Sequence, residues 1–241
     1  MKDFKRFILE GGNAVEGVGK IADKDIDPTI RHFKRTILDK IPVKISSEDL
    51  LGSAYKKSRF KSDYGDIDVA IDVNQLPKEA RATDLKGTVL WLANRLSEID
   101  PSLNKASKTL YTNTTFKLIS IAFPIVSSSN GTEKVQIDFM LTADPKYTRF
   151  FLRSPTKKEE FYKKGGLYRS LLLSAVTKRS SKNIVTKCGQ SFAAEGLILS
   201  GTLAKDGSRE IITDPQRVTD IIFGGKNVNM DVANSFMSIW N

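Results

Sequence analysis

The sequence has very little of the residue types that build several common kinds of functional site. Its 241 residues include one cysteine, Cys188, which excludes an intrachain disulfide and a zinc site built from cysteines. The single histidine, His32, excludes a histidine-based metal site and a Ser-His-Asp triad. No apolar run approaches the roughly 20 residues that span a bilayer, and the basic N-terminal residues lack the apolar core of a signal peptide. A reducing cytoplasm is therefore the expected location.

Positive charge is in excess. The 38 lysines and arginines outnumber the 28 aspartates and glutamates, for a net charge of +10. Such an excess favours anionic partners, either nucleotides or nucleic acid. A basic surface that only keeps the protein in solution explains the same value, and charge alone does not separate the two kinds of partner. The chain length suits one large domain or two small ones.

An acidic strand is the most informative part of the sequence. Asp66, Asp68 and Asp72 alternate with aliphatic residues, which predicts a strand over residues 66–73 with its carboxylates on one face. Asp66 and Asp68 would then lie close together with like charge, which is costly unless a cation lies between them. Oxygen-only ligands suit Mg²⁺ or Mn²⁺. The pattern therefore suggests a divalent metal site.

A basic segment precedes this strand. Gly52 and Ser53 form a small-residue turn, and four cations follow: Lys56, Lys57, Arg59 and Lys61. Such a segment could hold a polyanion, although solvated surface cations give the same pattern. A site that combines a metal with a phosphate group is the hypothesis that follows.

A third carboxylate stands on another predicted strand. Asp138 lies at the centre of an otherwise apolar strand over residues 135–141, and a strand over 114–126 precedes it. A turn rich in serine, asparagine and glycine separates the two, so they are expected to form a hairpin. A carboxylate among apolar residues needs a partner or a metal. Asp138 is therefore a candidate third ligand.

Helices are expected around these strands. Asp27 and Pro28 predict a helix start, with an apolar face through about Lys40. Thr83 is expected to cap a second helix, which ends at Asp100 and Pro101.

The pattern changes after Leu141, and a domain boundary is expected near residues 142–154. The second half is expected to contain helices over 166–178 and from Asp214 to Gly224, with a hairpin over 196–213 between them.

Three of these elements resemble the sequence pattern of the nucleotidyltransferase superfamily, which includes DNA polymerase beta, CCA-adding enzymes, poly(A) polymerases and 2′,5′-oligoadenylate synthetases. That pattern is an apolar residue with Gly-[Gly/Ser], then [Asp/Glu]-apolar-[Asp/Glu]-apolar, and later apolar-[Asp/Glu]-apolar. The matching elements are Leu51-Gly52-Ser53, Asp66-Ile67-Asp68-Val69 and Ile137-Asp138-Phe139, with 12 residues between Ser53 and Asp66. The sequence is also similar to uncharacterised nucleotidyltransferases of large bacteriophages, which implies a bacterial host cytoplasm.

The resemblance implies an α+β fold. Residues 1–145 would form a palm-like nucleotidyltransferase domain, with a mixed sheet and flanking helices. The resemblance covers only about residues 51–141, so it is the residue pattern of 146–241 that predicts a mainly helical C-terminal domain with a β-hairpin.

The resemblance also implies a reaction, the attack of an acceptor hydroxyl on the α-phosphate of a nucleoside triphosphate with release of pyrophosphate. Asp66 and Asp68 would bind two metal ions, Mg²⁺ or Mn²⁺, and Asp138 would bind the catalytic one and help to deprotonate the acceptor. Gly52 would let the backbone approach the triphosphate, and Ser53 would bind its β and γ oxygens. The charge of the leaving group would be neutralised by Lys56, Lys57 and Arg59.

Several alternatives remain open. The acceptor could be RNA, a protein hydroxyl or a small molecule, and a membrane partner is not expected. No Arg-Arg-Asp-Phe-Thr-like motif follows the acidic strand, which disfavours the CCA-adding subfamily. A non-catalytic nucleotide- or nucleic-acid-binding protein that retains the fold is one competing interpretation, and a basic structural protein with an incidental acidic strand is another. For Arg169 and Lys178, positions on a helix surface are expected rather than contacts with the nucleotide.

Overall fold

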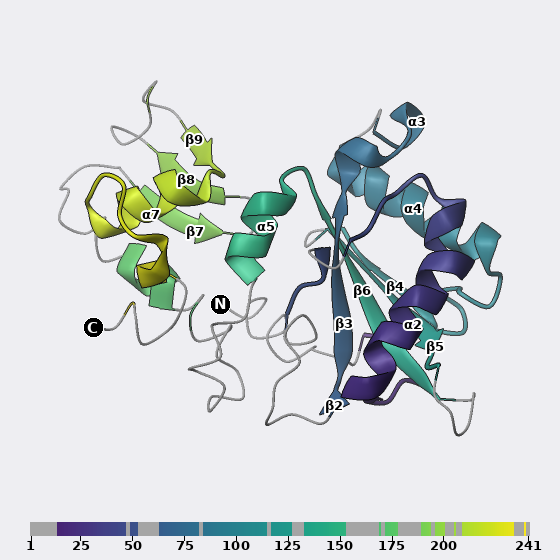
Figure 1. Ribbon diagram of the computed structural model, residues 1–241. Helices are drawn as coiled ribbons and strands as arrows, with labels where there is room; N and C mark the ends of the chain where they lie inside the picture. The colour runs from purple at the N-terminus through teal and green to yellow at the C-terminus, as the bar shows by residue number, and fades with distance from the viewer. Residues whose placement is uncertain are drawn as a thin grey trace. The chain divides into compact units, whose positions relative to one another are not determined.

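The chain divides into two compact units, Met1–Pro145 and Lys146–Asn241 (Figure 1). The structure is a computed structural model. It describes residues 14–46, 49–52, 63–81, 84–114, 117–126, 133–152, 169, 172–177, 189–193, 196–200, 205, 209–233 and 239.

The first unit is built on a four-stranded mixed sheet. Its strands are β3 (Asp66–Asp72), β4 (Leu110–Asn113), β5 (Leu118–Pro124) and β6 (Lys134–Thr142), in the order β3-β6-β5-β4 (Figure 1). Strand β3 runs parallel to β6, whereas β5 is antiparallel to both β6 and β4. The predicted hairpin of β5 and β6 and the α+β architecture are therefore confirmed. That this sheet is the nucleotidyltransferase fold stays a prediction.

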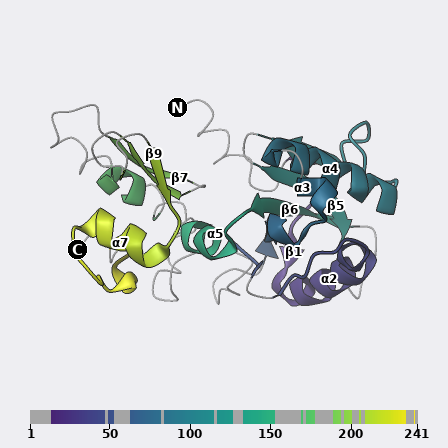
Figure 2. The ribbon, with the colours of Figure 1, turned by 90° about the horizontal axis from the view of Figure 1, so that it is seen from above.

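Helices cover the aliphatic side chains of the sheet. Phe33 of α2 (Asp23–Thr36) meets Phe123 and Phe139 edge-on, with ring centroids 5.0 and 5.4 Å apart. Helix α4 (Leu85–Ile99) adds Val89 and Leu92 to the same core, and α3 (Lys78–Arg81) lies beside it in both views (Figure 2). Burial of one face of each strand leaves the other face for polar residues.

Helix α2 begins about one turn earlier than the sequence predicted. It starts at Asp23, so Pro28 lies inside the helix and Asp27 is not its cap. Just before it, β1 (Ile21–Ala22) pairs with β2 (Asp63–Tyr64), two short strands that the sequence did not predict. Ile26 in the first turn is only 1% exposed, and its burial compensates for the hydrogen bond that an internal proline cannot make.

Two further boundaries also differ from the predictions. Asp84, not Thr83, is the N-cap of α4, because its carboxylate accepts a hydrogen bond from the Gly87 amide at 2.9 Å. Thr83 itself lies outside the described residues. The strand predicted over 114–126 is only β5, and β4 before it was missed. Lys117 between them has a φ of 55°, a turn conformation that ends the strand.

The second unit contains a three-stranded antiparallel sheet of β7 (Gly189–Ala193), β8 (Gly196–Ser200) and β9 (Arg209–Ile212). The pair β8 and β9 is the predicted hairpin, whereas β7 was not predicted. The described helices are α5 (Pro145–Leu152), residues 172–177 and α7 (Pro215–Phe223), with a short 3₁₀ helix η6 (Met230–Ala233). Asp214 caps α7 and Gly224 ends it with a φ of 69°, as the sequence predicted.

Candidate metal centre

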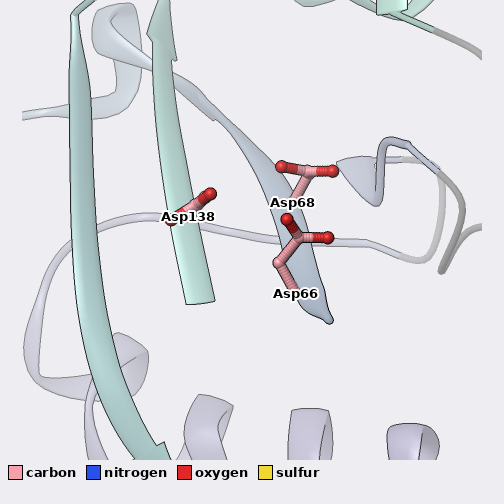
Figure 3. Close-up of side chains that lie close together, drawn as sticks. All are labelled: Asp66, Asp68 and Asp138. Carbon is pink, nitrogen blue, oxygen red and sulfur yellow. The ribbon is translucent and has the colours of Figure 1, made fainter. Parts of the chain in front are cut away.

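Three carboxylates lie together on the polar face of the first sheet. Asp66 and Asp68 extend from β3 and Asp138 from the adjacent β6 (Figure 3). In the parallel register Asp68 pairs with Asp138. One oxygen atom of each residue lies within 4.8 Å of those of the other two. The structure therefore brings together the three residues that the sequence predicted as metal ligands.

The alternation of residue types positions these side chains. Ile67 and Val69 are 0% and 2% exposed on β3, and Ile137 and Phe139 are fully buried on β6. Because neighbouring side chains in a strand point to opposite faces, burying the aliphatic residues places the aspartates on the other face. A slip of one residue would put carboxylates into the apolar core. The hydrophobic core thus keeps Asp66, Asp68 and Asp138 on the same face of the sheet.

Asp138 is the most buried of the three carboxylates, with 7% exposure. Burial penalises the charged form and, as the largest cause, raises the pKa of Asp138 to about 7 from its ordinary 3.8, and the negative charge of Asp66 adds to this increase. The Gln136 amide, which donates to the carboxylate, and the nearby Ser120 hydroxyl both favour the ionised form and lower the pKa. The Ser120 hydroxyl lies opposite Asp138 on β5 but completes no hydrogen bond with a described residue. Gln136, in contrast, donates hydrogen bonds to the Asp138 carboxylate.

Gln136 is a residue of the site that sequence reasoning missed. It is fully buried, and its amide nitrogen donates to both Asp138 oxygens, at 2.9 and 3.0 Å. Its amide oxygen accepts a hydrogen bond from the Ala14 backbone at 2.8 Å. The only sequence signal was its place two residues before Asp138, on the same face of the strand.

Gly52 packs directly against one of the ligands. The segment before it runs along the free edge of β3, where Leu50 pairs with Val69 and the Leu51 amide donates to the Asp68 carbonyl at 2.9 Å. The backbone of Gly52 has a φ of 61°, and a Cβ atom there would lie 2.1 Å from an Asp68 carboxylate oxygen. Glycine is therefore required for the close approach to Asp68. An approach to triphosphate stays a prediction.

The other candidate site residues do not join the carboxylate cluster in the described part of the chain. The other residues predicted to bind phosphate lie outside the described part of the chain; these are Ser53, Lys56, Lys57, Arg59 and Lys61. Lys178 also lies outside it. Asp72 ends β3 and accepts a hydrogen bond from the Asn74 amide at 2.9 Å, away from the cluster.

The sequence suggested a helix-surface position for Arg169, but the structure buries this residue. It is 2% exposed within the second unit, donates to the carbonyls of Ala233 and Phe151, and lies 5.0 Å from the Phe150 ring centroid. These contacts give it a structural role, because a buried guanidinium needs several acceptors.

The donor set fits a hard divalent cation. Three carboxylate oxygens from two adjacent strands are the ligands that Mg²⁺ and Mn²⁺ prefer, and among the described residues no cysteine or histidine joins them. Asp66 and Asp68 are only partly buried, so a cation can reach them from solvent.

Comparisons with known proteins do not extend this assignment. No protein-family model matches the chain, and none of the curated proteins is significantly similar to it. Among the described helices, none combines the length and the apolar character that a membrane crossing requires.

Proposed function

We propose that the protein is a metal-dependent nucleotidyltransferase, which transfers a nucleoside monophosphate from a nucleoside triphosphate to an acceptor hydroxyl and releases pyrophosphate. The observation that carries the proposal is the cluster of Asp66, Asp68 and Asp138 on adjacent parallel strands, with ligand oxygens within 4.8 Å of one another. The order of the motifs, with a Gly-Ser pair ahead of the acidic strand, supports it.

In the proposed reaction, the acceptor oxygen bonds to the α-phosphorus while the bond from that phosphorus to the bridging oxygen breaks. Two bound Mg²⁺ or Mn²⁺ ions would neutralise the charge on the attacking and leaving oxygens. Asp66, Asp68 and Asp138 would supply the carboxylate ligands. By the resemblance, Asp138 would also help to deprotonate the acceptor hydroxyl.

The phosphate contacts of the proposed function come from the resemblance alone. Gly52 and Ser53 would bind the triphosphate, and the leaving group would be held by Lys56, Lys57 and Arg59. The net charge of +10 favours RNA among the three classes of acceptor.

Label transfer from nucleotides tests the proposal. The full chain is incubated with α-³²P-labelled triphosphates, Mg²⁺ or Mn²⁺, and separately with total RNA, a protein lysate or small-molecule hydroxyl compounds. A variant with both Asp66→Asn and Asp68→Asn should transfer no label, because two ligands lose their charge. Asp72→Asn is the matched control, since Asp72 lies on the same strand outside the cluster and its asparagine can still accept the Asn74 amide.

Transfer to one acceptor class by the wild type and by Asp72→Asn, but not by the double variant, would support the proposal and identify the acceptor. If no acceptor receives label and no pyrophosphate is released with any nucleotide, the enzymatic proposal is wrong. Metal-independent binding of RNA by all three proteins would then favour the binding-protein interpretation.

A further inference from the structure

We propose that Gln136 is a positioning residue, which holds the Asp138 carboxylate so that one of its oxygens faces Asp66 and Asp68 before a metal binds. This inference rests on the metal site of the proposed function. It concerns the protein's own hydrogen bonds, and its test requires no nucleotide and no acceptor.

The orientation of the Gln136 amide is determined by the backbone. The Ala14 amide is an N–H group and can only donate, so the side-chain atom 2.8 Å from it must be the amide oxygen. The amide nitrogen then faces Asp138, which can only accept when it is ionised. The chain Ala14–Gln136–Asp138 thus has one consistent direction of donation.

The contact restrains the carboxylate. The Gln136 nitrogen lies 2.9 Å from one Asp138 oxygen and 3.0 Å from the other, and Gln136 is fully buried. Rotation of the carboxylate would lengthen at least one of these contacts and leave the buried Gln136 amide with a poorer hydrogen-bond partner. The oxygen that faces Asp66 and Asp68 therefore stays within 4.8 Å of theirs.

A purely structural role makes a different prediction. If Gln136 only satisfied buried polar groups, its replacement would lower stability and leave metal affinity unchanged. A positioning role predicts weaker metal binding as well, because outer partners of metal ligands contribute about 10- to 100-fold to affinity. Stability and metal affinity must therefore be measured on the same variants.

The experiment compares Mn²⁺ dissociation constants, from the electron paramagnetic resonance signal of free Mn²⁺, with thermal unfolding midpoints of the full chain. Gln136→Met keeps the length of the side chain but has no amide. Gln136→Asn keeps an amide that is one methylene shorter. The control, Thr88→Val, removes a buried hydrogen bond of 2.9 Å to the Ala80 carbonyl in the same unit, away from the carboxylates.

Both Gln136 variants should bind Mn²⁺ at least about tenfold more weakly than the wild type, whereas Thr88→Val should lose stability and bind normally. Unchanged binding in either folded Gln136 variant, or an equal loss in Thr88→Val, would overturn the inference and leave the proposed function intact. If wild-type binding equals that of the Asp66→Asn and Asp68→Asn double variant, the metal site itself is absent and both proposals fall.

Discussion

Replacement of Asp138 by asparagine should stabilise the metal-free protein at neutral pH while it removes a metal ligand. The folded protein buries this carboxylate at 7% exposure, and burial is the main cause that raises its pKa to about 7. Asparagine has nearly the same shape and no charge to desolvate. Its amide oxygen can accept from Gln136, and its amide nitrogen can donate to the Ser120 hydroxyl, so the buried polar groups keep partners.

The sign and the size of the effect follow from proton linkage. Between the ordinary carboxyl pKa of 3.8 and the raised pKa of about 7, the folded protein keeps the Asp138 proton and the unfolded chain has lost it. The free energy of unfolding therefore falls by about 1.4 kcal/mol for each pH unit in this range and is constant above it. Between about pH 5 and about pH 8, titration of Asp138 should lower the free energy of unfolding of the wild type by about 3 kcal/mol. The Asp138→Asn variant should not show this decrease.

Urea unfolding at several pH values measures this difference. Trp91 of α4, partly buried against the core of the first unit, reports on that unit when the other tryptophan is removed in a Trp240→Phe background. The stability curves of wild type and Asp138→Asn should diverge as the pH rises from about 5 to 7 and then run parallel. Parallel curves over the whole range would refute the reasoning. Addition of Mn²⁺ should restore stability only to the wild type.

Two further substitutions test other parts of the structure. Gly52→Ala places a Cβ atom 2.1 Å from an Asp68 oxygen at a φ of 61°, whereas Gly17→Ala has a φ of 73° and no neighbour within 4 Å. Gly17→Ala should lose about 1–2 kcal/mol of stability by urea unfolding, and Gly52→Ala should lose more because of the added contact with Asp68. Only Gly52→Ala should also weaken Mn²⁺ binding, and equal Mn²⁺ affinities of the two variants would contradict the close approach. Asp214→Ala removes the cap of α7, where the Arg217 amide holds the pKa of Asp214 below its ordinary value. The substitution should lower the free energy of unfolding by about 1 kcal/mol, measured by far-ultraviolet circular dichroism, and by less as acid protonates the wild-type cap. Unchanged stability would rule out the cap.

The sequence was sufficient to predict the strands that carry the ligands. Alternation identified β3, a mostly apolar run identified β6, and the two-residue period placed Asp66, Asp68 and Asp138 on the faces opposite the aliphatic residues. Alternation describes one strand at a time, so it could not state that β3 and β6 are neighbours or that Asp68 lies opposite Asp138. Pairing depends on long-range packing, and the resemblance supplied that expectation instead.

The elements that were missed have weak local signals. Strand β7, with the sequence Gly-Gln-Ser-Phe-Ala, has no alternation of apolar residues, and β4 has only four residues. Both become strands because a neighbouring strand offers hydrogen bonds. Gln136 was missed for another reason, since its contact with Ala14 joins residues 122 positions apart in the sequence. No local pattern predicts that an amide at this position is oriented by the backbone.

The buried Asp138 links metal binding to protonation. A carboxylate must lose its proton before it can bind Mg²⁺ or Mn²⁺, and Asp138 keeps its proton up to about pH 7 because burial outweighs the hydrogen bond from Gln136. Binding below that pH therefore releases a proton, and affinity should rise with pH until the carboxylate is ionised in the free protein. The metal offsets the same desolvation cost that destabilises the metal-free fold. A site with the lower pKa of an exposed carboxylate would lack this coupling, so the burial of Asp138 on β6 makes the affinity of the cluster sensitive to pH near neutrality.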